Sequence, residues 1–96
     1  MRVRDAWLAH ERYAGRRLAT AGVVRVFEAG TPREYFTLDD GPHRIGLRGD
    51  ATQLRALIGH PVRATGVLTF KPGVGIFLEV EVVEPTTPAR RRAWHA

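Results

Sequence analysis

Two runs of alternating side chains near the end of the chain predict a β-hairpin. In the first run, one face of the strand carries Val62, Ala64, Gly66, Leu68 and Phe70. In the second run, one face carries Ile76, Leu78, Val80 and Val82, and the other carries Phe77, Glu79, Glu81 and Val83. The segment 71–75 between them reads Lys-Pro-Gly-Val-Gly, which is typical of a hairpin loop. We therefore expect two antiparallel strands, with the first-named set of each run on one buried face.

The same period of two recurs earlier in the chain. Residues 17–27 alternate with Gly22 in their middle, as Gly66 lies within the later run. A glycine inside a strand favours a sharp bend or a close approach of another backbone. Residues 34–39 and 43–48 flank an Asp-Gly-Pro turn and predict a second hairpin. Its expected core face consists of Phe36, Leu38, Ile45 and Leu47.

Two short segments have the pattern of helices. Asp5 can cap a helix over residues 6–13, which are mostly good helix formers, and Gly15 follows it. Asp50 can cap a second helix over residues 51–58, in which leucine and isoleucine recur at helical spacing before Gly59.

The resulting order of strand, strand, strand, helix, strand, strand resembles the OB fold, a five-stranded Greek-key barrel. The resemblance covers residues 16–84 and rests on this order, on the two glycine-bent strands and on the position of the second helix. Barrels of the SH3 type lack a helix at that place. We expect an all-β fold with short helices: an N-terminal helical segment over residues 1–15, an OB-like barrel over 16–84 and a basic C-terminal tail over 85–96.

Charge is unevenly distributed along the 96 residues, whose formal net charge is +5. Residues 20–84 hold seven Lys or Arg against eight Asp or Glu, so the basicity lies at the two ends of the chain. No apolar run approaches the roughly 20 residues of a membrane span, and the first ten residues lack the apolar core of a signal peptide. We expect a cytoplasmic protein without a membrane partner.

No residue pattern in the chain predicts a catalytic or metal site. Cysteine and serine are absent, and the four histidines show no spacing typical of metal ligands. The sequence therefore predicts no enzyme activity, no cofactor and no metal.

The resemblance to OB folds implies a ligand face over the second and third strands and the loops beside them, where single-stranded nucleic acid often binds. Aromatic side chains would stack on bases, and arginines would pair with phosphates. The candidate residues on the barrel are Arg25, Phe27, Tyr35, Thr37, Arg44, Arg48, Lys71 and Phe77, and those on the tail are Arg90, Arg91 and Arg92.

Two considerations weigh against nucleic-acid binding on this face. Asp39, Glu79 and Glu81 are expected near the same surface and would repel a polyanion. Tyr35 and Phe27 could instead pack under the N-terminal segment, leaving the arginines as ordinary solvated charges. The leading hypothesis is a non-enzymatic module that binds single-stranded DNA or RNA with little sequence preference. The alternative is a protein-interaction or assembly adaptor that uses the same barrel face or a strand edge.

Overall fold

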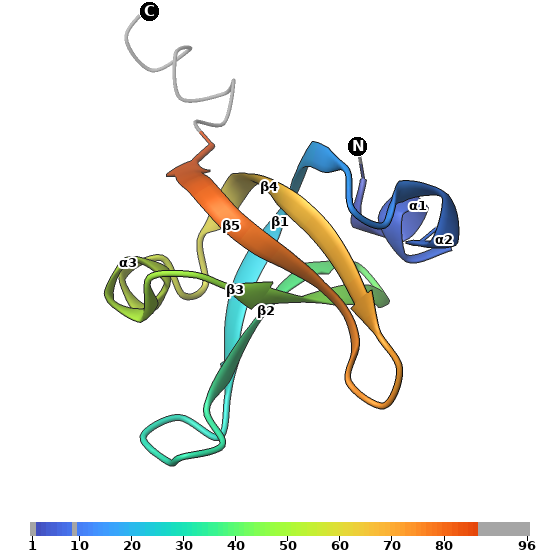
Figure 1. The fold of residues 1–96 in the computed structure, drawn as a ribbon. Coiled ribbons are helices and arrows are strands. Elements are labelled where there is room, and N and C mark those ends of the chain that lie inside the picture. Colours follow the sequence, from blue (N-terminus) through green and yellow to red (C-terminus); the bar gives the residue numbers. More distant parts are fainter. Residues whose placement is uncertain (1, 9, 87–96) are drawn as a thin grey trace, which may run out of the picture.

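A closed five-stranded barrel dominates the computed structural model, which describes residues 2–8 and 10–86 (Figure 1). The strands are β1 (Arg17–Phe27), β2 (Tyr35–Asp40), β3 (His43–Arg48), β4 (Pro61–Lys71) and β5 (Gly75–Pro85). They follow the order β1-β2-β3-β5-β4, and β4 pairs with β1 to close the ring. The β3–β5 pair is parallel and the other pairs are antiparallel. The predicted fold class, a β barrel with one helix between the third and fourth strands and a short N-terminal helix, is confirmed.

Strand β1 is long because it pairs with β4 over its first part and with β2 over its last part. Its residues 17–23 pair with β4, and its residues 23–27 pair with β2. Gly22 lies where β1 passes from pairing with β4 to pairing with β2, and an added Cβ there would be only 2.6 Å from the carbonyl oxygen of Asp39. The close backbone approach predicted for this glycine is therefore confirmed.

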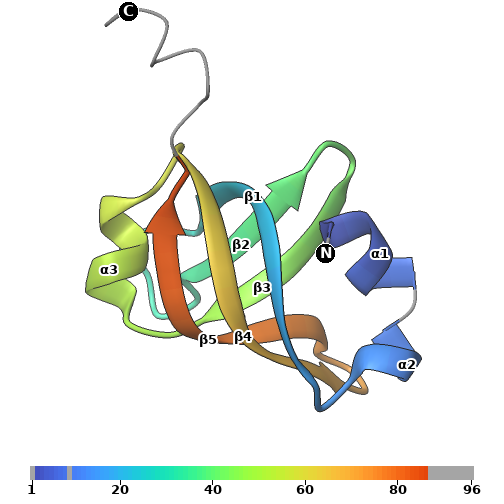
Figure 2. The same ribbon diagram turned by 90° about the horizontal axis from the view of Figure 1, so that it is seen from above.

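The core fills the barrel and extends under helices on two sides. The largest fully buried side chains inside the barrel include Leu38, Ile45, Leu68 and Leu78. Helix α3 (Ala51–Ala56) adds Leu54 to this core, and helix α1 (Val3–Leu8) adds Val3 and Ala6. Figures 1 and 2 show α3 and α1 on opposite sides of the barrel. The short helix α2 (His10–Tyr13) leads from α1 towards β1.

Both predicted helices differ in extent from the observed ones. The N-terminal helix begins at Val3 rather than after Asp5, because burial of Val3 places the first turn earlier, and its described residues are Val3–Leu8 and His10–Tyr13. Helix α3 keeps its Asp50 cap but ends at Ala56. Beyond it, the Gly59 amide donates to the Val24 carbonyl at 2.8 Å, which ties the chain to β1 before another helical turn can form. None of the helices in residues 2–8 and 10–86 is long and apolar enough to cross a membrane.

In the second half of β5, the side chains point to the opposite side of the sheet from the one predicted. Val82 is 53% exposed and Val83 is 5% exposed. A β-bulge explains the reversal, since Thr65 pairs with Val82 whereas Gly66 pairs with Val80. The extra residue moves the following side chains to the other face.

Phe70, which was also expected in the core, is 43% exposed. It pairs with Ile76, beyond the segment Phe77–Glu79 where β5 meets β3, so it lies on the part of the hairpin that extends past the barrel (Figure 1).

Candidate functional site

A groove of about 430 Å³ opens on the outer face of β2 and β3 beside the β4–β5 loop. Its size falls within the range of small-ligand sites. Five of the residues predicted from sequence line it: Tyr35, Thr37, Arg44, Arg48 and Phe77. Val74 of the loop and Ile76 of β5 also line the groove, and the sequence analysis did not select them. The signal that could have found them was their position, with Val74 in the loop that flanks the expected face and Ile76 just after it.

An aromatic surface built by β1 and β2 adjoins the groove at Tyr35. Phe27 and Tyr35 are cross-strand partners, and their rings stack with centroids 5.2 Å apart at an interplanar angle of 15°. The guanidinium carbon of Arg44 lies 4.5 Å from the centroid of the Phe27 ring. Tyr35 is 49% exposed. The groove is therefore bordered by a partly open aromatic surface with a cation beside it.

The N-terminal segment does not cover this aromatic surface. Helix α1 lies near the other end of β2, where the Arg2 side chain pairs with Asp40 at 3.3 Å. Tyr35 starts the same strand, five residues earlier and so about 16 Å away along it. The alternative in which Tyr35 packs beneath the N-terminal segment is therefore wrong.

At the other side of the groove, a buried aromatic ring supports an exposed cation. The guanidinium carbon of Arg48 lies 4.1 Å from the centroid of the Phe77 ring. Phe77 was expected to be exposed, but it is 3% exposed. The ring lies close against β3 because its neighbour there is Gly46, whose added Cβ would be 3.0 Å from that of Phe77. Phe77 thus positions Arg48 and does not itself offer an open stacking surface.

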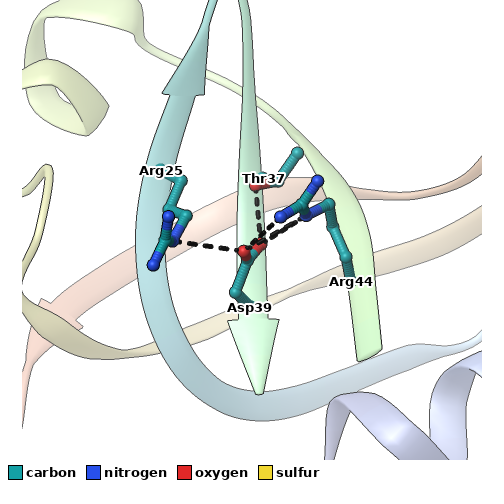
Figure 3. A network of polar contacts seen from close by, with 4 residues as sticks. All are labelled: Arg25, Thr37, Asp39 and Arg44. Carbon is teal, nitrogen blue, oxygen red and sulfur yellow. Dashed lines mark hydrogen bonds and ion pairs between the residues drawn. The ribbon is translucent and has the colours of Figure 1, made fainter. Parts of the chain in front are cut away.

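A network of polar contacts centres on the carboxylate of Asp39 (Figure 3). The Thr37 hydroxyl donates to its Oδ1 at 2.7 Å. Arg44 donates from Nε and Nη2 at 3.1 and 2.9 Å, and the Nε of Arg25 forms an ion pair at 3.3 Å. The hydrogen bond with Asp39 raises the pKa of Arg44 above its ordinary value, so this side chain stays cationic.

Thr37 was expected on the exposed face, but only 2% of it is accessible. It keeps the predicted facing, yet its short side chain lies between those of Arg25 and Arg44 and points towards Asp39 (Figure 3). Its part in the groove is therefore to hold the carboxylate. The network could have been anticipated, because a tight turn at residues 41–42 places Asp39 directly opposite Arg44.

The other predicted residues that the structure describes, Arg25, Phe27 and Lys71, lie outside the groove lining. Arg25 reaches the groove only through Asp39, and Lys71 is exposed at the end of β4. Arg90, Arg91 and Arg92 lie outside the described residues. Of the acidic residues expected to oppose a polyanion, Glu81 is paired with Arg17 at 2.6 Å, and Glu79 is exposed as the cross-strand neighbour of Arg48.

Within residues 2–8 and 10–86, no three histidine, aspartate or glutamate side chains gather closely enough to hold a metal ion.

Comparison with known proteins identifies a similar fold but no family. No protein-family model matches this chain, and no curated protein matches it in sequence. The barrel is similar to the structure of the hypothetical protein ygiW from E. coli, with a TM-score of 0.61 and 13% identity over 90% of this chain and 88% of that one. At this identity the similarity shows a shared small β fold and carries no information on function.

Proposed function

We propose that this chain is an OB-fold module that binds single-stranded DNA or RNA without enzymatic activity and with little sequence preference. The observation that supports this function is the half-exposed stack of Tyr35 on Phe27, with the Arg44 guanidinium beside it, at the mouth of a groove. The strand order and the helix between β3 and β4 match those of OB folds, which often bind on this face.

Base stacking would supply the larger part of the affinity. Every base has a flat apolar face, so an open aromatic side chain accepts any of them, at about 1–3 kcal/mol per base. Tyr35 has the accessible area for such a contact. A site that reads the flat face of a base, and not its hydrogen-bonding edge, has little sequence preference.

The local charge around the groove favours a polyanion even though residues 20–84 carry one more acid than base. Arg25, Arg44 and Arg48 gather near the groove, and Asp39 is the acid in contact with the first two. Charges farther away than the Debye length, about 10 Å at 0.1 M salt, are largely screened. The local surplus of arginine therefore matters more for a bound strand than the total charge.

Titration of a labelled oligothymidine and a labelled oligouridine tests this function. Tyr35→Ala should weaken binding of both by about 5- to 150-fold, which corresponds to about 1–3 kcal/mol. Val82→Ala is the matched control, because Val82 is also an exposed apolar residue but lies outside the groove lining. Circular dichroism and melting would verify that both variants fold. Equal affinity of the parent and the Tyr35→Ala variant would refute a stacking role.

A protein-interaction adaptor remains the second candidate, because Val74 at 63% and Tyr35 at 49% exposure would also suit apolar side chains of a partner. Such an adaptor would bind its partner on the barrel face. Binding along a strand edge is less favoured, because the strands close into a ring. A parent protein that binds neither oligonucleotide even at low salt would favour the adaptor.

A further inference from the structure

A single carboxylate holds two of the arginines near the groove. Arg44 donates to both carboxylate oxygens of Asp39, from Nε to Oδ1 and Oδ2 and from Nη2 to Oδ2, and Arg25 on the neighbouring strand forms an ion pair with the same carboxylate (Figure 3). Hydrogen bonds of this charged, two-pronged kind are about twice as strong as those between neutral groups. A nucleic-acid phosphate would have to compete with a carboxylate that is already in place.

The carboxylate itself is fixed in position. Its side chain is only 11% exposed, and the hydroxyl of the buried Thr37 donates to it at 2.7 Å. The flanking strands supply both arginines, so neither can leave without exposing a negative charge in a poorly hydrated place. Asp39 therefore acts as a built-in anion that occupies these cations.

Arg48 differs from Arg44 in this respect. Its guanidinium lies over the Phe77 ring, and among residues 2–8 and 10–86 no ion pair joins it to a carboxylate. The outward surface of Arg48 is exposed. The groove lining thus contains one arginine paired with a carboxylate, Arg44, and one that forms no ion pair, Arg48, although the exposed Glu79 is its cross-strand neighbour.

We propose that Asp39 determines what the groove recognises: by occupying Arg25 and Arg44, it limits phosphate pairing and makes binding depend on base stacking. This inference rests on the proposed function and deepens it. Arg44 then extends the aromatic surface of Phe27 and does not serve as a phosphate contact, whereas Arg48 pairs with the strand backbone. Removal of the carboxylate should convert the groove into a stronger but less discriminating binder of polyanions.

The dependence of affinity on salt measures this directly. For a single strand, each neutralised phosphate contributes about −0.7 to the slope of log K against log salt. Asp39→Asn should free up to two arginines, raise the affinity for labelled oligothymidine at low salt and steepen the slope by about 0.7–1.4. Asp40→Asn is the matched control. It adds the same unit of charge at the next residue of β2, where Asp40 pairs with Arg2 outside the groove.

A second set of variants keeps the test valid if Asp39→Asn fails to fold. In the parent background, Arg48→Gln should flatten the slope by about 0.7, and Arg44→Gln should change it by less than half as much. Where Asp39→Asn does fold, adding Arg44→Gln to it should flatten the slope by about 0.7 as well.

The outcomes separate the two proposals. A parent that binds no oligonucleotide at any salt concentration overturns the proposed function and this inference with it. A parent that binds, with the same slope for Asp39→Asn or equal effects of Arg44→Gln and Arg48→Gln, overturns the role of Asp39 alone. A steeper slope for Asp40→Asn equal to that of Asp39→Asn would reduce the effect to net charge and also overturn it.

Discussion

Gly66 is the position at which the smallest side-chain addition should have the largest effect on stability. An added Cβ would lie 2.0 Å from the carbonyl oxygen of Glu79 and 2.8 Å from its carbonyl carbon. Cβ atoms essentially never approach a non-bonded heavy atom closer than 3.0 Å, so β4 and β5 would have to separate by about 1 Å. The obstacle is backbone on a paired strand and cannot rotate away. We therefore expect Gly66→Ala to cost about 3 kcal/mol, the upper end of the range for overpacking.

Thermal and urea unfolding measure this cost. A loss of about 3 kcal/mol should lower Tm by about 12–24 °C in a domain of this size. Gly73→Ala is the matched control: Gly73 lies in the β4–β5 loop at φ +81° with nothing within 4 Å of an added Cβ, so it suffers backbone strain without a clash. It should lose about 1 kcal/mol. If the two variants unfold at the same urea concentration, the close approach of Glu79 does not determine stability at the bulge.

Two further predictions concern a buried hydroxyl and the response to acid. Thr20 is 2% exposed, and its hydroxyl has no hydrogen-bond partner among the described residues, so Thr20→Val should stabilise the barrel by about 1 kcal/mol in urea unfolding; a loss of stability would show that the hydroxyl is bonded. The hydrogen bond from Arg55 lowers the pKa of Glu34 below its ordinary 4.5, and that from Arg17 does the same for Glu81. A lowered pKa in the folded state means that both pairs stabilise the fold above about pH 4.5 and cease to do so as pH falls through the folded-state values. The unfolding free energy should therefore fall on acidification, less steeply for Glu34→Gln than for the parent, and equal pH profiles would contradict the sign.

Alternation and glycine positions were sufficient to predict most of the barrel. All five strands appear where the period of two indicated them, and Gly22 and Gly66 both mark close backbone approaches. The failures lie where tertiary contacts override a local pattern. The bulge opposite Gly66 adds its extra residue to β5, and a sequence reveals the glycine without revealing which strand takes the extra residue. The end of α3 likewise depends on hydrogen bonds between Val24 and the distant segment 59–60.

The sequence predicts the side of the barrel on which the site residues lie, but not how far neighbouring side chains cover them. Alternation places Thr37 and Phe77 on the outer side of the barrel, and both face that way. What buries them is a neighbouring long side chain: Arg44 beside Thr37 and Arg48 over Phe77. Arginine rotamers are not encoded in strand periodicity, because the same residue can extend into solvent or lie along the sheet. The sequence therefore predicts which residues share a face and leaves their contacts open.

The charge pairs change how the acidic residues of the barrel should be interpreted. From the sequence, Asp39, Glu79 and Glu81 were expected to oppose a polyanion, and residues 20–84 carry one more acid than base. In the fold, Glu81 is paired with Arg17, and Asp39 contacts Arg25 and Arg44, so these two acids are neutralised at short range, whereas Glu79 stays exposed beside Arg48. The same pairing also occupies the arginines, which reduces both the repulsion and the attraction that a bound strand would feel. The salt dependence of binding should then follow the cations that form no ion pair within residues 2–8 and 10–86, Arg48 above all, and not the formal charge of +5.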